Sequence, residues 1–208
     1  MSRTRHLLSS FALIAGLAAG LGPRPAAADG AAWMRPKSDY MAHTVMEADG
    51  ARLTGRVWAS GEKERRELAV SGRTHDVILR RDLGVAWILM PEQRMYLEQP
   101  LGEHDRMASG DLVREAVGKE SVNGVETTRY RIHGTAGDGR PFEGTMWMTE
   151  QDIPVRVVTG EGPERVRIEL EGLSLGFVAP GRFEIPRGWS RFELPDSAKA
   201  DLDAMRRR

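Results

Sequence analysis

Short runs of alternating apolar and polar residues, separated by glycine, proline, asparagine and aspartate, recur along most of this 208-residue chain. A period of two places successive side chains on opposite faces, as in antiparallel strands with one face on a core and the other in water. The sequence therefore predicts a mainly β protein with few helices. The predicted strands are Tyr40 to Ala48, Arg52 to Ser60, Lys63 to Val70, Asp76 to Arg81, Val85 to Met90, Met95 to Gln99, Lys119 to Val122, Val125 to Gly134, Phe142 to Thr149, Val155 to Thr159 and Arg165 to Leu175.

The turns between these strands carry their own signals. Asn123-Gly124 is the strongest, because a type I′ hairpin turn needs positive φ at both central residues and these two residue types tolerate it. Asp49-Gly50 and the segment Pro91 to Arg94 predict two more turns. Strands joined by such short turns form antiparallel hairpins.

Two helices are predicted. His104 to Val117 places Met107, Leu112, Val113 and Val117 roughly on one side, although Gly110 weakens the pattern. A second helix is expected to close the chain, with Asp196 or Ser197 as its N-cap.

The N-terminus predicts secretion. Arg3 and Arg5 precede an apolar run from Leu7 to Leu21, and Ala26 to Ala28 form a small-residue cleavage site, so residues 1–28 are interpreted as a signal peptide. The alternative interpretation is a membrane anchor, but serines and glycines interrupt the run and prolines follow it. No later apolar run is long enough to span a bilayer. We expect residues 29–208 to form a single periplasmic β domain with no stable membrane anchor.

Composition and motif spacing exclude several classes of function. The chain has no cysteine, which excludes disulfides, a cysteine nucleophile, iron–sulfur ligation and the acylated cysteine of a bacterial lipoprotein. Its 30 basic and 30 acidic residues lack the basic excess that nucleic-acid binding needs. The histidines are scattered, and neither a zinc motif, a G-x-S-x-G elbow nor a phosphate-binding glycine loop is present. The sequence predicts no enzyme activity, no metal and no cofactor.

The alternation also predicts which residues share a face. In the strand from Arg52 to Ser60, one face carries Leu53, Gly55, Val57 and Ala59. The hairpin around Pro91 to Arg94 places Ile88, Met90, Met95 and Leu97 on one face and Trp87, Leu89 and Tyr96 on the other. Small inward residues beside long methionines are expected to line a curved sheet unevenly and to leave a groove.

Four segments resemble a known family. They are Val85 to Tyr96 (VAWILMPEQRMY), Val122 to Tyr130 (VNGVETTRY), Gly144 to Arg156 (GTMWMTEQDIPVR) and Phe183 to Trp189 (FEIPRGW). In this order they resemble uncharacterised periplasmic proteins grouped with the LolA/LolB-like lipoprotein carriers. The resemblance implies a curved antiparallel sheet, an incomplete β-barrel capped by helices, whose apolar concave side accepts lipoprotein acyl chains. The absence of cysteine is a departure from the anchored, receptor type.

From these observations we expect a periplasmic protein that binds a lipid or a lipoprotein acyl chain. The predicted ligand-binding residues are Leu53, Val57, Ile88, Met90, Met95, Leu97, Met146 and Met148, with Arg65 as an inward cation for a head group. Two alternatives remain for these side chains: the methionines fill core gaps, and Arg65 lies on a solvated edge strand. The alternative function is an envelope-stress sensor that uses the same sheet to bind a protein partner. A metal- or small-molecule-dependent hydrolase is a third hypothesis.

Overall fold

The structure is a computed structural model that describes residues 36–48, 50–101, 113–135, 141–162 and 165–193. The strands form one 12-stranded sheet in the order β12-β6-β5-β4-β3-β2-β1-β11-β10-β9-β8-β7. Their bounds are β1 Tyr40–Ala48, β2 Ala51–Ser60, β3 Lys63–Val70, β4 Arg73–Arg80, β5 Val85–Met90, β6 Met95–Pro100, β7 Val113–Val122, β8 Val125–Thr135, β9 Pro141–Met148, β10 Pro154–Thr159, β11 Val166–Leu175 and β12 Ser190–Arg191. Two short 3₁₀ turns, η2 Pro91–Gln93 and η4 Pro180–Phe183, accompany the strands.

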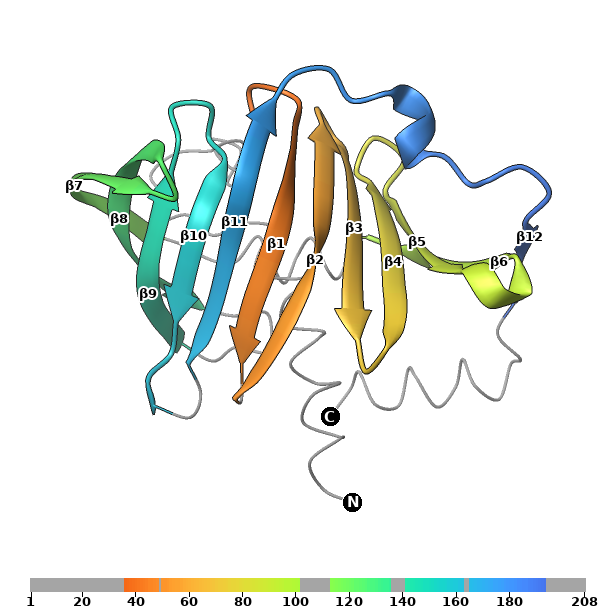
Figure 1. Cartoon of the computed structure of the whole chain (residues 1–208), viewed down its shortest axis with the longest axis horizontal. Coiled ribbons are helices and arrows are strands. Elements are labelled where there is room, and N and C mark those ends of the chain that lie inside the picture. The colour runs from red at the N-terminus through yellow and green to blue at the C-terminus, as the bar shows by residue number, and fades with distance from the viewer. Residues whose placement is uncertain (1–35, 49, 102–112, 136–140, 163–164, 194–208) are drawn as a thin grey trace.

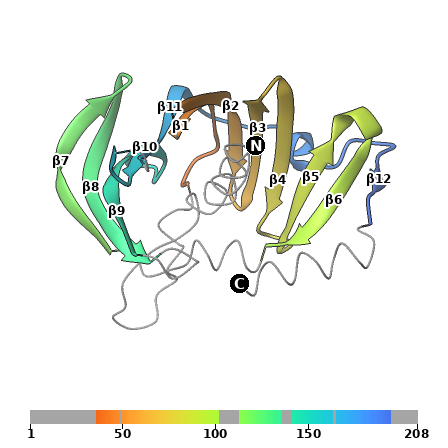
Figure 2. The same ribbon diagram turned by 90° about the horizontal axis from the view of Figure 1, so that it is seen from below.

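The sheet is curved and does not close (Figure 1). Figure 2 shows an arch with β1, β2 and β11 at its crown, β7 to β9 in one arm and β4 to β6 in the other. All neighbouring strands are antiparallel except β12, which pairs with β6 in parallel. The mainly β, curved and unclosed antiparallel sheet predicted from the sequence is confirmed.

The predicted helix from His104 to Val117 is wrong at its C-terminal end. Val113 to Val117 lie in β7, which pairs with β8 over most of its length. The pattern of Val113, Glu115 and Val117 is compatible with a strand, which has a period of two, as well as with a helix. Pairing with β8 decides in favour of the strand. Residues 104–112, the signal peptide and the predicted C-terminal helix lie outside the described ranges. Among the residues described, no helix is long and apolar enough to cross a bilayer.

At two glycines of the sheet, a side chain would collide with the backbone of the neighbouring strand. A Cβ atom built on Gly55 of β2 would lie 2.0 Å from the carbonyl oxygen of Glu67 on β3. On the other arm, a Cβ on Gly144 of β9 would lie 2.3 Å from the carbonyl oxygen of Val158 on β10. Carbon and oxygen cannot approach this closely, so neighbouring backbones come together here only because no side chain intervenes.

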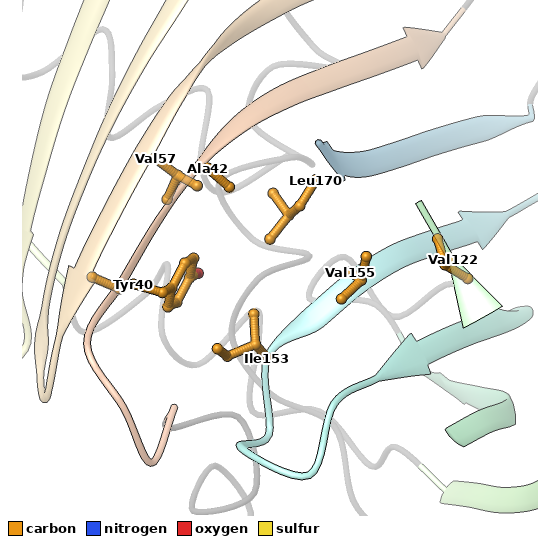
Figure 3. Packing of buried hydrophobic residues seen from close by; sticks show 8 residues of the cluster. Tyr40, Ala42, Val57, Val122, Ile153, Val155 and Leu170 are labelled. Atoms are coloured by element: carbon orange, nitrogen blue, oxygen red, sulfur yellow. The ribbon is translucent and has the colours of Figure 1, made fainter. Parts of the chain in front are cut away.

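Hydrophobic residues from both sides of the crown meet in one core. Figure 3 shows Tyr40, Val57, Leu170 and Ile153 facing one another inside the bend. Together with Ala42, Ala59, Val122 and Val155 they form one buried cluster. A second buried cluster, Ile132, Met146 and Met148, lies on the arm formed by β8 and β9.

The convex face is covered on one arm by residues 176–191, here called the outer segment. Its Val178 and Phe183 pack with Trp58, Ile78, Trp87 and Leu89 of the sheet, and Phe183 and Ile78 are fully buried. Arg65 Nη1 donates a hydrogen bond to the Arg182 carbonyl at 3.1 Å, and Arg80 binds the Glu184 carboxylate at 3.0 Å. The sequence analysis placed apolar residues on both faces of this part of the sheet. On the convex face these residues are covered by the outer segment of the same chain.

Candidate functional site

The eight predicted apolar ligand-binding residues lie on the concave face. Residues directly opposite on paired strands point to the same face. One row of such partners runs from Val57 through Arg66 and Val77 to Ile88 and Leu97. A second row runs Leu53, Met46, Ile168, Val157, Met146.

The other three predicted residues are Met90, Met95 and Met148. Met90 lies opposite Met95 on the β5–β6 hairpin, and Met148 follows Met146 by two residues. Because alternate residues of a strand share a face, all eight side chains face the inside of the arch.

The two arms differ in how open their apolar side chains are. Met146 and Met148 are 3% and 1% exposed and pack against Ile132 and Tyr130, so the β8–β9 arm is filled by its own core. Leu53 at the crown and Ile88, Met90, Met95 and Leu97 on the β5–β6 hairpin are only half-buried. The β5–β6 hairpin therefore presents the apolar area that a ligand would contact.

Arg65 lies on the opposite face and is not brought together with the other eight. Its Nε donates to Asp76 Oδ1 at 3.0 Å, and its partners across β2 and β4 are Trp58 and Ile78 of the convex face. A shift of one residue along a strand exchanges its faces, so the neighbouring Arg66 lies on the concave side. Leu68, which alternates with Arg66, was the sequence signal for this assignment.

Arg66 belongs to a buried charge cluster of three residues, Glu64, Arg66 and Arg81. The Nε of Arg66 donates to Glu64 Oε1, and Arg81 Nη2 donates to Glu64 Oε2 at 3.2 Å. Glu64 is only 8% exposed. Burial by itself raises the pKa of Glu64, but the attraction and hydrogen bonds of the two guanidiniums together outweigh it and hold the pKa below its usual range.

The cluster predicts an acid-sensitive component of stability. Since the pKa of Glu64 is lower in the folded chain than the ordinary 4.5, its contribution is present above that pH and is lost as pH falls below it. We expect Glu64→Gln to lower the urea midpoint at pH 7, because the half-buried guanidiniums of Arg66 and Arg81 both lose this carboxylate partner. The difference in urea midpoint between Glu64→Gln and the unsubstituted protein should become smaller towards pH 3.

Glu115→Gln is the matched control, because the Glu115 side chain is 69% exposed. It should leave the urea midpoint nearly unchanged at both pH values. If Glu64→Gln lowered the urea midpoint by the same amount at pH 7 and at pH 3, the stabilising role of the ionised Glu64 carboxylate would be contradicted. Asp76, whose pKa burial raises, acts in the opposite direction, so the comparison between variants isolates Glu64.

A polar cavity of about 200 Å³ lies on the convex face around Glu169. The Glu169 carboxylate accepts hydrogen bonds from Asn123 Nδ2 at 2.9 Å, Arg156 Nη2 at 2.6 Å and Arg167 Nε at 2.8 Å. Burial acts to raise the pKa of Glu169, and these donors more than offset it. Both carboxylate oxygens of Glu169 are engaged by these donors. We therefore interpret the residues around the cavity as holding the Asn123 turn against β11, and we do not assign the cavity to a ligand.

The histidines, which the sequence offers as further candidate ligands, lie on different strands. His43, His75 and His133 lie on β1, β4 and β8, and His104 is outside the described ranges. Among the residues that the structure describes, no group of three or more His, Cys, Asp or Glu side chains is placed to hold a metal ion. Trp58 and Trp87 lie under the outer segment, and the ring of Trp147 stacks with Arg156 at 5.3 Å.

Comparison with known proteins gives the fold. No family model matches the chain, and no curated protein matches it either. An uncharacterized conserved protein from Thermus thermophilus superposes with a TM-score of 0.53 at 13% identity, covering 75% of this chain and 90% of the other. PNGF-II superposes with a TM-score of 0.50 at 8% identity, covering 79% of this chain.

MucB, known also from a Pseudomonas aeruginosa MucA/MucB complex, superposes with a TM-score of 0.49 at 16% identity, covering 80% of this chain. This chain spans 66% of the length of MucB and 32% of that of PNGF-II. At these identities the likeness is one of fold alone. The curved, unclosed antiparallel sheet that the sequence resemblance implies is confirmed.

Proposed function

We propose that this protein is a periplasmic binding protein that holds the acyl chain of a lipid or lipoprotein against the concave face of its sheet. The observation that carries the proposal is the half-buried apolar surface of the β5–β6 hairpin, where Ile88 faces Leu97 and Met90 faces Met95. Covering such a surface removes apolar area from water, which is the dominant favourable term in binding an acyl chain.

The energy available suits reversible capture. Each buried methylene contributes about 0.8 kcal/mol, so a long acyl chain gains on the order of 10 kcal/mol before ordering costs. Methionine side chains are unbranched and polarizable, and they adapt to chains of different shape. A surface of this kind binds acyl chains without a single rigid geometry, as a carrier that must also release its cargo requires.

The test is a titration with a fluorescent hexadecanoate analogue. We expect the double variant Met90→Gln/Met95→Gln to bind at least about tenfold more weakly, because an amide pair replaces apolar contact at facing positions and tenfold corresponds to about 1.4 kcal/mol. Met41→Gln is the control, since Met41 is 49% exposed and lies on the convex face. Equal affinities for all three proteins, or no binding by the unsubstituted protein, would refute the proposal.

The natural ligand can be sought directly. Mass spectrometry of organic extracts from protein purified out of a periplasm should recover phospholipid or lipoprotein acyl chains. A clean extract from protein that also fails the titration would favour a function without a transported ligand.

The second candidate function is a protein-interaction module of the cell envelope. Four of the five exposed large hydrophobic residues in the described ranges lie on the rim that is uppermost in Figure 1: Met41, Leu83, Leu175 and Phe177, the last 83% exposed. Exposed apolar residues grouped on one rim are typical of a contact surface. If a protein partner binds here, a photo-crosslinking residue at position 177 should give one discrete adduct in cells and one at Glu143 should give none.

A further inference from the structure

We infer that Asn123 is a site of spontaneous deamidation and that the docking of its side chain on β11 controls the rate. Asn123 is the only asparagine of the chain, and Gly124 follows it. Because glycine has no side chain, its backbone nitrogen is the least hindered for attack on the preceding amide. Both residues are exposed at the tip of the β7–β8 hairpin, where water reaches them. The reaction requires no bound ligand, so it is independent of the proposed function.

The reaction consumes one water molecule and releases one ammonia molecule. The Gly124 nitrogen bonds to Asn123 Cγ, the Cγ–Nδ2 bond breaks, and the proton lost by the Gly124 nitrogen leaves with Nδ2 as ammonia. Water then adds to one of the two carbonyl carbons of the cyclic imide and opens the ring. The product is aspartate if the bond from nitrogen to Cγ breaks, and isoaspartate if the bond from nitrogen to the backbone carbonyl carbon breaks. No atom is oxidised or reduced, and a neutral amide becomes a carboxylate.

The folded hairpin protects this amide. Asn123 Nδ2 donates to Glu169 Oε1 at 2.9 Å and to the Leu170 carbonyl at 3.0 Å, so both of its hydrogens are bound. The adjacent Val122 is 1% exposed and packs with Val155 and Leu170 (Figure 3). Loss of Nδ2 as ammonia gives up both hydrogen bonds, so these bonds stabilise the amide against reaction. Deamidation should therefore proceed mainly when the hairpin tip opens from β11.

The product docks less well than the amide. A carboxylate at position 123 offers only acceptors to the Glu169 carboxylate and the Leu170 carbonyl, so both contacts change from attractive to repulsive. Because the ammonia is lost to solvent, the change is not reversed when the tip closes again. Deamidation therefore leaves the hairpin tip without its polar contacts to β11, and the apolar contacts of Val122 remain.

The rate can be measured at pH 8 and 37 °C by mass spectrometry of the tryptic peptide 120–129, in which deamidation replaces NH2 by OH. We expect deamidation of the folded protein to be at least about tenfold slower than that of the chain unfolded in guanidinium chloride, because opening costs two hydrogen bonds. Glu169→Ala removes one acceptor and should speed the reaction of the folded protein about tenfold. Glu171→Ala is the matched control, since Glu171 is exposed two residues further along β11, and it should leave the rate unchanged.

Asn123→Asp reproduces one of the two products, and aspartate tolerates the φ of 52° at this position. It should lower the urea midpoint at pH 8 and lower it less at pH 3, where the introduced carboxyl is protonated and can donate again. If Glu169→Ala does not fold, Glu169→Gln replaces it and should speed deamidation by a smaller factor. Equal rates in the folded and unfolded chains, or in the Glu169 variant and the unsubstituted protein, would overturn control by docking. No deamidation of the unfolded chain would overturn the site itself.

Discussion

Replacing Phe183 by alanine is expected to lower the free energy of unfolding by about 3–5 kcal/mol, the usual cost of removing a fully buried phenylalanine. Phe183 is 0% exposed and packs with Trp87, Ile78 and Trp58 beneath the outer segment. A loss of this size is a large fraction of the stability of an ordinary domain. Urea unfolding followed by tryptophan fluorescence measures it, since two tryptophans of the cluster report on its exposure.

Phe177→Ala provides the matched control in the same segment. Phe177 is 83% exposed, so its truncation should change the free energy of unfolding by no more than about 0.5 kcal/mol. Comparable losses for the two substitutions would mean that the outer segment does not form the cover described for the convex face.

Gly144→Ala is the second substitution with a large expected effect. Its Cβ would lie 2.3 Å from the Val158 carbonyl oxygen and 2.9 Å from the Thr159 side chain, so β9 and β10 must move apart. Overpacking of this kind costs about 1–3 kcal/mol, and the obstacle here is backbone rather than a flexible side chain. Gly55→Ala should behave in the same way, because its Cβ would meet the Glu67 carbonyl oxygen at 2.0 Å.

Gly118→Ala is the control for both glycine substitutions. Gly118 lies on β7, its φ is not in the left-handed region, and no atom lies within 4 Å of its Cβ position. We expect an unchanged or slightly higher urea midpoint, because alanine restricts the unfolded chain more than glycine does. A Gly144→Ala protein as stable as Gly118→Ala would show that the arch does not depend on close approach of β9 and β10.

Local signals in the sequence predicted the sheet well. Asn123 and Gly124 have φ values of 52° and 77°, as a type I′ turn requires, and the Pro91 to Arg94 turn ends with Arg94 in the left-handed region. The face assignments around these turns were also correct, because alternation and turn type together set the register. The eight apolar residues predicted to bind a ligand therefore lie on a single face, and their binding role stays a prediction.

Features that depend on distant contacts were not predicted. Arg65 was chosen over Arg66 because most residues of this strand are charged and Leu68 is a weak local signal of the inward face, which pairing of Arg66 with Val57 and Val77 establishes. Val113 to Val117 fit two periods, and β8 selects one of them. The covering of Trp58 and Trp87 by Phe183 joins residues about a hundred positions apart, which no local pattern encodes.

The two arms of the arch are not supported equally. The outer segment runs along the β5–β6 arm and ends as β12, whose neighbouring residue Phe192 donates its N–H to the Tyr96 carbonyl at 2.7 Å. Within the described ranges, β7 pairs with β8 alone. Amide hydrogens of β7 should therefore exchange with deuterium sooner than those of β6, except beside the turn that Asn123 holds against β11.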